Sequence, residues 1–367
     1  MTNLFDPIAF GAIAAPNRIM MAPLTRGRAT RSHVPTPLMA EYYSQRASAG
    51  LILSEATGIT QQGLGWPGAP GLWSEEQVAA WKPIVRAVHD AGGRIVAQLW
   101  HMGRLVHPDF LGGAQPVSAS ATTAPGHART YEDPKPYAES RALEIHEIKK
   151  IIGDYKLAAE HAMAAGFDGV QLHAANGYLI DQFLRNGTNR RADSYGGTVE
   201  NRIRLLIEVT QALINTAGAD RTGVRLSPND DPQGCGDSES ESLFTKVAEA
   251  LNGLQIAFLE MRASRPESTF RPATRQLVPA IRRAFKGTLI LNSDYALDDA
   301  SQALRLREAD AIAFGRPFLA NPDLPARFAK RIVLNTPNTK TFYTPGPAGY
   351  TDYPALTQAA AVAMTAY

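Results

Sequence analysis

His173, Asn176 and Tyr178 lie within six residues of one another, in a stretch at 166–179 that reads GFDGVQLHAANGYL. The short apolar run just before them follows an Ala-Gly pair, a pattern typical of a helix end and then a buried strand. An imidazole and an amide can donate two hydrogen bonds to one substrate oxygen and draw charge onto it. A phenol can act as a general acid. Each residue alone could equally serve packing or capping, but their combination predicts a site that holds one oxygen and delivers one proton.

The chain repeats a pattern of helix, small-residue stop and apolar strand. Strands this continuously apolar are covered on both faces, as in parallel sheets. Eight such units favour a closed (β/α)8 TIM barrel, in a single domain spanning 1–367, over a doubly wound sheet, which stays the alternative. The eight predicted strands lie within 17–23, 51–56, 94–100, 169–173, 223–227, 256–261, 288–292 and 311–315.

Three segments stand outside this repeat. Residues 1–16 are expected to form a short N-terminal β-hairpin that caps the bottom of the barrel. The stretch 100–141, after the third strand, is a long loop excursion rich in Gly, Pro, Ser and His, and loops of this length are typical of lids or site walls. The glycines at 63–68 match GxGxxG, but they stand in a Gly/Pro loop with no helix starting at the last glycine, which argues against a dinucleotide-binding turn.

The composition of the chain limits the binding partners and cofactors that we expect. The net charge of +2 balances 37 basic against 35 acidic residues, and without a basic arm we expect no nucleic acid partner. The single cysteine, Cys235, excludes an internal disulfide or a cysteine-rich cluster, and the eight histidines lack ligand spacing, so no metal is expected. No run of 18 apolar residues indicates a membrane span, and the N-terminus lacks signal-peptide features, so we expect a cytoplasmic protein.

Polar residues gather at the ends of the predicted strands, where barrels of this kind carry their chemistry. Arg225 lies inside the otherwise apolar fifth strand, and a buried arginine is costly without an anionic partner. That partner is either a structural carboxylate or an electron-rich ring that becomes anionic on reduction. Gly315 and Arg316 close the eighth strand at the usual phosphate position of barrels, beside the loop at 292–294.

A series of motifs in order then identifies a family. They are MAPLTR at 21–26, SEATGI at 54–59, QLWHMGR at 98–104, the block that starts at 166, RRADSYGGTVENRIRLL at 190–206, GVRLSP at 223–228, AFGRPFLANPDLP at 313–325 and TFYTPGPAGYTDYP at 341–354. Over nearly all of residues 3–354 the chain resembles the old yellow enzyme family of FMN-dependent ene-reductases. Thr25, where another branch has cysteine, makes it similar to the branch of pentaerythritol tetranitrate reductase and N-ethylmaleimide reductase.

The resemblance implies FMN as cofactor, NADPH or NADH as reductant, and activated alkenes (enones, enals, maleimides, nitroalkenes) as substrates, in a monomer or homodimer. His173 and Asn176 would bind the substrate oxygen, and Tyr178 would donate the proton. Trp100 and Tyr350 would shape the substrate pocket. The residues expected to contact FMN are Pro23, Leu24, Thr25, Ala56, Gln98 and Arg225 around the ring, and Asp294 (through its backbone), Gly315 and Arg316 at the phosphate.

Two rival functions remain at this point. One is reduction of nitrate esters or nitroaromatics by the same flavin. The other is a flavin-free phosphate-binding barrel such as an aldolase-like lyase, which would need a strand lysine or a metal cluster. None of the eight predicted strands carries a lysine. One departure from relatives is Ser293 in the seventh-strand loop, where glycine is more usual.

Overall fold

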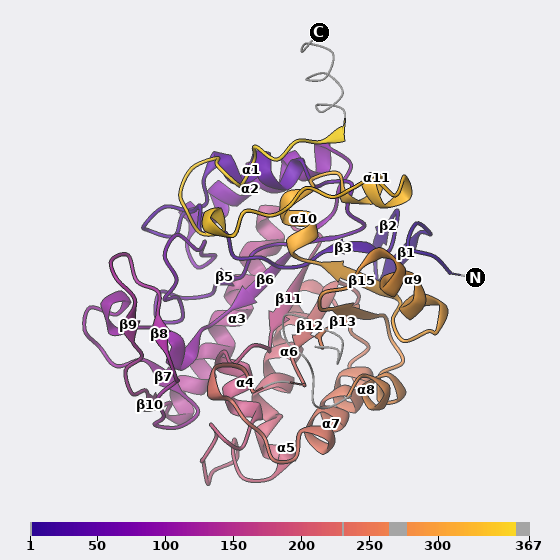
Figure 1. Cartoon of the computed structure of the whole chain (residues 1–367). Helices are drawn as coiled ribbons and strands as arrows, with labels where there is room; N and C mark the ends of the chain where they lie inside the picture. Colours follow the sequence, from indigo (N-terminus) through magenta and orange to yellow (C-terminus); the bar gives the residue numbers. More distant parts are fainter. Residues whose placement is uncertain (1, 230, 264–276, 357–367) are drawn as a thin grey trace.

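Eight parallel strands close into a barrel in the computed structural model, which describes residues 2–229, 231–263 and 277–356 (Figure 1). Each strand pairs with the next one along the chain, and pairing of the last strand, β15, with the first, β3, closes the ring. The predicted (β/α)8 barrel is confirmed, and the doubly wound alternative is wrong because an open sheet would lack this closing pair. The strands are β3 (Ile19–Met21), β4 (Ile52–Leu53), β6 (Ile95–Trp100), β11 (Gly169–His173), β12 (Thr222–Leu226), β13 (Phe258–Arg262), β14 (Leu289–Asn292) and β15 (Ala311–Phe314).

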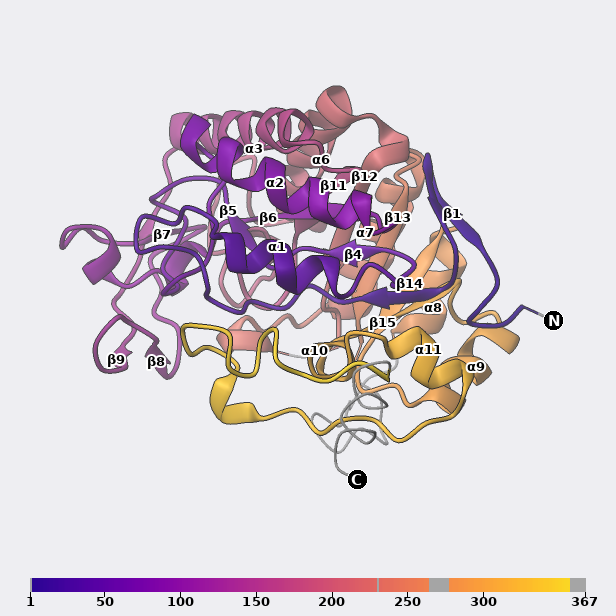
Figure 2. The same ribbon diagram turned by 90° about the horizontal axis from the view of Figure 1, so that it is seen from above.

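Helices surround the barrel, as Figure 2 shows from above. The helix before β11 ends at Gly166, whose φ of 95° is left-handed, a conformation that glycine adopts without steric cost. This is the Ala-Gly stop seen in the sequence. The described helices are α1 (Pro37–Ser44), α2 (Glu75–Asp90), α3 (Ile145–Ala165), α4 (Leu179–Leu184), α5 (Val199–Arg202), α6 (Arg204–Ala217), α7 (Ser240–Gly253), α8 (Val278–Ala284), α9 (Leu297–Arg305), α10 (Arg316–Ala320) and α11 (Leu324–Ala329).

The lower half of the barrel interior is apolar and closed from below. Strands β1 (Ile8–Phe10) and β2 (Ile13–Ala15) form the expected hairpin, and Phe10 meets Phe258 of β13 edge to face, with 5.9 Å between ring centroids. Phe258 fills the lumen so fully that a Cβ at Gly223 would lie 2.3 Å from its ring. The hairpin cap is therefore confirmed as a plug of the barrel bottom.

The next layer of the interior is polar on five adjacent strands. Side chains of a strand alternate between faces, so the residue two positions after an inward apolar residue also points inward. This layer lies between the apolar lumen and the open end of the barrel, where the strands finish. Its members are Gln98, Gln171, Arg225, Glu260 and Asn292.

The excursion after β6 has more regular structure than its composition suggests. It contains η1 (Gly103–Leu105), η2 (Pro108–Phe110), β7 (Val117–Ser118), β8 (His127–Ala128) and β9 (Lys135–Pro136), and β7 pairs with β10 (Arg141–Ala142). The GxGxxG stretch lies in the loop between β5 (Thr57–Gly58) and α2, so it opens no helix at its last glycine.

The C-terminal segment returns to the barrel mouth after α11, through η5 (Thr339–Thr341), and runs beside α10 in both views (Figures 1 and 2). Arg26 donates to the carbonyls of Phe342 and Gly349, and Arg28 donates to those of Thr341 and Phe342. Two arginines that follow β3 thus hold this segment over the mouth.

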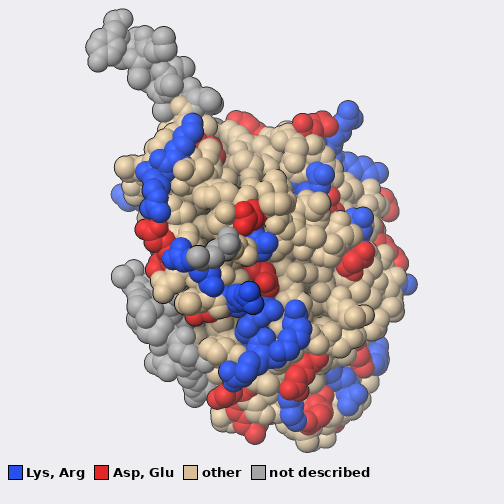
Figure 3. Space-filling model, turned by 90° about the vertical axis from the view of Figure 1, so that its right-hand side faces the viewer, with Lys and Arg blue, Asp and Glu red and all other residues tan. Residues whose placement is uncertain are grey.

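The face in Figure 3 carries positive and negative side chains interspersed, with one group of Lys and Arg near its lower centre. Among the residues that the structure describes, we find no helix with the length and apolarity that crossing a membrane requires.

Candidate active site

A cavity of about 1100 Å³ opens at the carboxyl ends of the strands. Its wall also includes Trp66, Arg262, Phe342 and Tyr343, to which the sequence analysis gave no role. The predicted site residues that line it are Pro23, Leu24, Thr25, Asn176, Tyr178, Arg225, Asp294, Gly315 and Arg316. The fold thus brings together residues that are up to about 290 positions apart in the chain, because parallel strands end at the same rim.

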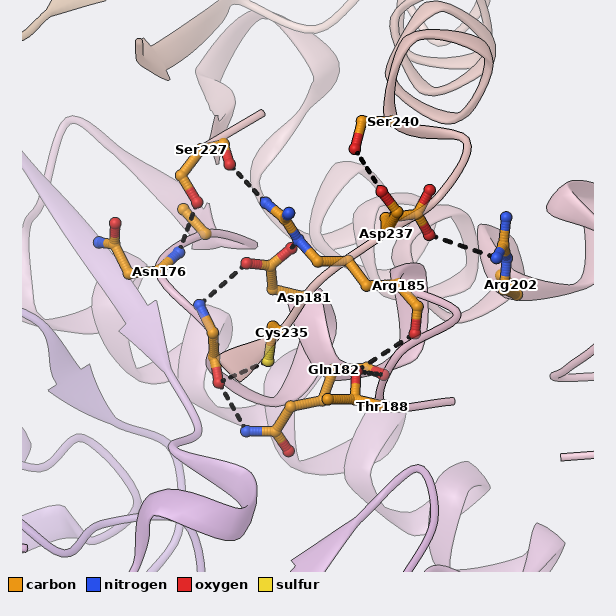
Figure 4. Close-up of polar contacts among 12 residues, drawn as sticks. Asn176, Asp181, Gln182, Arg185, Thr188, Arg202, Ser227, Cys235, Asp237 and Ser240 are labelled. Atoms are coloured by element: carbon orange, nitrogen blue, oxygen red, sulfur yellow. Dashed lines mark hydrogen bonds and ion pairs between the residues drawn. The ribbon is translucent and has the colours of Figure 1, made fainter. Parts of the chain in front are cut away.

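The turn that presents Asn176 and Tyr178 is fixed by its backbone (Figure 4). Asn176 and Gly177 have φ of 61° and 79°, both in the left-handed region. The backbone N–H of Asn176 donates to Ser227 Oγ at 2.7 Å, and that of Gly177 donates to Asp181 Oδ2 at 2.9 Å. A Cβ at Gly177 would stand 2.5 Å from the carbonyl oxygen of Pro232, so a larger residue does not fit there.

A buried ion pair supports this turn from behind. The side chains of Asp181 and Arg185 are both fully buried, and Arg185 Nε lies 2.7 Å from Asp181 Oδ1. Arg185 also donates to the carbonyl of Ser227, so the pair connects the turn after β11 to the end of β12 (Figure 4). Burial raises the pKa of Asp181, and the positive charge of Arg185 opposes that rise.

Cys235 belongs to the same buried network. Its thiol lies 3.7 Å from the carbonyl oxygen of Gly177, to which it donates (Figure 4). Burial raises the pKa of Cys235 to about 11, so the sulfur stays protonated at neutral pH. A protonated, buried thiol is a packing and hydrogen-bonding group, not a nucleophile.

The orientation of the Asn176 side chain is set by Arg262. Arg262 Nη1 donates to Asn176 Oδ1 at 2.6 Å. Because a guanidinium has donors alone, the amide oxygen must face it, and the NH2 group of Asn176 must point elsewhere. Both residues line the cavity, so the amide presents N–H donors to a ligand there.

His173 adjoins the cavity beside Tyr178, which lines it, and is itself 3% exposed. Its ring packs against Trp100 and Tyr178, with centroid distances of 6.3 and 5.0 Å. Burial, followed by the charges of Arg225 and Arg262, holds the pKa of His173 well below its usual range, so the ring is neutral. Its Nδ1 accepts from the backbone N–H of Ala175 at 3.4 Å, which assigns the ring proton to Nε2. His173 is therefore a neutral hydrogen-bond donor.

Tyr178 projects into the cavity over the edge of Trp100, with 4.9 Å between the ring centroids. Burial raises the pKa of Tyr178 above its ordinary value, although Arg225 and Arg262 act in the opposite direction. The phenol keeps its proton at neutral pH and so has one to give.

Arg225 has the structural carboxylate partner that the sequence left open as one alternative, and it also lines the cavity. Its Nε lies 3.2 Å from Glu260 Oε1, and its Nη2 donates to Asn292 Oδ1 at 2.9 Å, while the guanidinium also lines the cavity. Gln98 and Ala56 lie just behind that wall, 1% and 5% exposed. A cationic guanidinium beside an amide suits the carbonyl- and imide-bearing edge of a flavin ring, so these residues fit FMN.

At the far end of the cavity, Gly315 precedes α10 and Arg316 begins it. Arg316 forms an ion pair with the side chain of Asp294, whose φ is 43°. The left-handed residue of this loop is Asp294 and not its neighbour Ser293, so the serine does not strain the loop. A phosphate bound here would share Arg316 with the Asp294 carboxylate.

The structure places Tyr350 away from the cavity, contrary to the expectation that it shapes the substrate pocket. Its ring is fully buried and stacks on Tyr42 at 4.0 Å and 8°. Tyr343 and Phe342, in the same C-terminal segment, line the cavity in its place. Trp100, 1% exposed, is not among the lining residues either, but its ring contacts those of His173 and Tyr178.

Comparisons with known proteins agree with this geometry. A family model described as the NADH:flavin oxidoreductase / NADH oxidase family matches residues 3–335. The solved old yellow enzyme homologue from Zymomonas mobilis is 59% identical with a TM-score of 0.95, over 97% of this chain and 100% of that one. Morphinone reductase, solved in complex with tetrahydroNAD, is 44% identical with a TM-score of 0.92, over 97% and 98%. The 12-oxophytodienoate reductase 2 of Arabidopsis thaliana is 42% identical, over 96% of each chain.

The chain therefore belongs to the old yellow enzyme family, within the NADH:flavin oxidoreductases. It is an oxidoreductase with FMN as cofactor and a reduced nicotinamide as electron source. The flavin-free barrel is thereby excluded.

Proposed function

We propose that this enzyme reduces the carbon–carbon double bond of activated alkenes, such as enones, enals, maleimides and nitroalkenes, with NADPH or NADH as reductant. The proposal is carried by the pairing of Arg262 with Asn176, which turns the amide donors into the same cavity that Tyr178 enters. Oxygen-directed donors and a protonated phenol in one cavity are what the reduction of such an alkene requires.

His173 Nε2–H and the Asn176 NH2 group donate to the carbonyl or nitro oxygen of the substrate. These two hydrogen bonds stabilise the charge that builds on that oxygen as the β-carbon is reduced. Tyr178 then gives its proton to the α-carbon. When bound, FMN supplies the hydride that it has taken from the nicotinamide.

Around the cofactor we assign holding roles to the predicted residues. Gln98 and Thr25 hold the polar edge of the ring, with Pro23, Leu24 and Ala56 packed around it. Arg225 stabilises negative charge at that edge. Asp294, Gly315 and Arg316 hold the phosphate. The cavity geometry supports these roles, because it runs without a break from the Asn176 turn to α10.

The names of two relatives support the substrate class, since oxophytodienoate reductase and morphinone reductase are both named for the reduction of oxo compounds. A nitrate ester or nitroaromatic also presents an oxygen that the same donors could bind. It is the second candidate substrate.

The test is a two-step anaerobic assay on the purified holoenzyme. NADPH and NADH are first compared by the rate at which each bleaches the flavin absorbance. The reduced enzyme is then mixed with 2-cyclohexenone, N-ethylmaleimide, β-nitrostyrene or a nitrate ester. We expect fast reoxidation by the three alkenes, with saturated products. Reoxidation by the nitrate ester alone would favour the second candidate, and protein without flavin absorbance would overturn the proposal.

A further inference from the structure

Glu260 is a carboxylate in the barrel interior that the proposed reaction does not use. It is fully buried on β13, inside the polar layer just below the cavity. Its Oε2 accepts from Gln171 Nε2 at 2.8 Å, and its Oε1 lies 3.2 Å from Arg225 Nε. That second contact is an ion pair that lacks the alignment of a hydrogen bond. A buried carboxylate carries a large desolvation cost, so its partners show what it does.

Burial raises the pKa of Glu260, but the positive charge of Arg225 opposes that rise and favours the ionised carboxylate, which fixes the direction of the hydrogen bond that Glu260 accepts. An ionised carboxylate accepts and cannot donate, so Gln171 must turn its NH2 group toward Glu260 and its oxygen away. That oxygen accepts from Gln98 Nε2 at 2.7 Å. Gln98 must therefore turn its own oxygen away from Gln171. The three side chains form a relay from β13 through β11 to β6 that ends in a hydrogen-bond acceptor at Gln98.

That acceptor matches the cofactor. The polar edge of an oxidised flavin carries two carbonyl groups and one imide N–H between them, and an N–H needs an acceptor. Without a fixed neighbour, a glutamine can offer either its oxygen or its NH2 group. The relay removes that freedom before the cofactor arrives.

Glu260 also acts on Arg225 through charge. A carboxylate 3.2 Å from the guanidinium offsets part of the positive charge that Arg225 presents to the cavity. A flavin gains negative charge on reduction, and a positive neighbour favours the reduced form. Glu260 should therefore hold the reduction potential of bound FMN below the value that Arg225 alone would set.

We propose that Glu260 is a positioning residue for the flavin, which fixes the Gln98 amide through Gln171 and lowers the reduction potential of FMN through Arg225. The inference rests on the cofactor-binding roles proposed above for Gln98 and Arg225.

The proposed effect of the Glu260 charge on the reduction potential is tested with Glu260→Gln, which keeps the shape of the side chain and removes its charge. We expect the ratio of reduced to oxidised FMN at a fixed potential to rise about tenfold, equivalent to about 30 mV for this two-electron couple. The potential is measured by reduction in the presence of a reference dye.

Two control variants accompany this measurement. Glu249→Gln removes an exposed charge on α7 and should leave the reduction potential unchanged. Glu260→Asp retains the charge and should change the ratio less than about threefold. Equal shifts in Glu260→Gln and Glu260→Asp, or no shift in Glu260→Gln, would overturn this half of the proposal.

The relay is tested through FMN affinity. In Glu260→Gln the new amide oxygen stays with Arg225, so its NH2 group faces Gln171 and reverses the relay. Gln171→Leu interrupts the relay instead. Each variant should bind FMN about tenfold more weakly, the usual scale for one lost hydrogen bond. The double variant should lose no more than either single one, because the two changes break the same chain. Additive losses would refute the relay, and so would unchanged affinity in both variants.

These outcomes separate the inference from the function it rests on. If wild-type protein binds FMN and reduces enones but Glu260→Gln leaves potential and affinity unchanged, the inference alone fails. If Arg225→Gln leaves FMN affinity and potential unchanged in an otherwise wild-type chain, the proposed role of Arg225 fails first.

Discussion

A 2.6 Å hydrogen bond joins Arg262, at the end of β13, to Asn176, in the turn after β11, where both residues line the cavity. The two strands are not neighbours, because β12 lies between them. This contact decides the chemistry of Asn176. Without it, the amide could present either its oxygen or its NH2 group to a substrate. With it, the amide is a donor, which is what a carbonyl or nitro oxygen needs.

Replacing Arg262 by methionine should therefore weaken the oxygen clamp. We expect reoxidation of the photoreduced enzyme by 2-cyclohexenone to slow about tenfold, the scale of about 1.4 kcal/mol for one well-placed hydrogen bond. Stopped-flow absorbance of the flavin measures this rate. Reoxidation by molecular oxygen needs no clamp and serves as the control. Equal slowing with both oxidants would show that Arg262 acts on the flavin instead of on Asn176.

Tyr178→Phe removes the proposed proton donor and keeps the ring that packs on Trp100. The oxidative half-reaction with enones should slow about 10²–10⁴-fold, the usual contribution of a general acid. Product analysis after reaction in deuterium oxide would show how much protonation from solvent remains. A variant that keeps full activity on enones would remove Tyr178 as sole donor while leaving the clamp intact.

The pH profile of the enone reaction should be flat from about pH 6.5 to pH 9. The pKa of His173 is lowered, so its ring stays neutral as the pH falls to that limit. The pKa of Tyr178 is raised, so its phenol stays protonated as the pH rises. Both groups thus hold their required forms throughout. A limb in kcat near pH 6.5 that Tyr178→Phe retains and His173→Gln abolishes would contradict the neutral-imidazole assignment.

Breaking the Asp181–Arg185 pair should cost stability, because each single change leaves a buried charge without its partner. We expect Asp181→Asn to lose about 3–5 kcal/mol of unfolding free energy in urea. The double variant Asp181→Asn with Arg185→Met should recover part of this loss. Asp298→Asn, which breaks an exposed pair with Arg331, should change stability by less than about 1 kcal/mol. A loss of the same small size at Asp181 would show that the pair does not support the turn.

The sequence predicted the barrel because strand periodicity and glycine stops are local signals. It also placed the residues that end strands, such as Asn176 and Arg225, because the fold puts all strand ends at one rim. It did not predict the partners of those residues. Glu260 stood in the predicted sixth strand and Arg262 directly after it, both without a role, since pairing across a barrel depends on register. Glu260 lies two residues before Arg262, so the two side chains share one face of the strand. This spacing was the available signal that Glu260 points into the barrel.

Tyr350 shows a different limit of prediction from the sequence. The segment TFYTPGPAGYTDYP holds three tyrosines, and motif resemblance alone assigned the pocket to the second. The hydrogen bonds of Arg26 and Arg28 to nearby carbonyls fold this segment so that Tyr343 faces the cavity and Tyr350 stacks on Tyr42. Long-range contacts of this kind leave no pattern in the local sequence.

The central claim is that His173 and Asn176 together hold the substrate oxygen while FMN is bound. Its most direct test is the double variant His173→Ala with Asn176→Ala, photoreduced so that nicotinamide binding does not enter, and then mixed with 2-cyclohexenone or oxygen. We expect the enone rate to fall at least about 10²-fold, with the oxygen rate unchanged, as when donors to a developing oxyanion are removed. An unchanged enone rate with FMN still bound would contradict it.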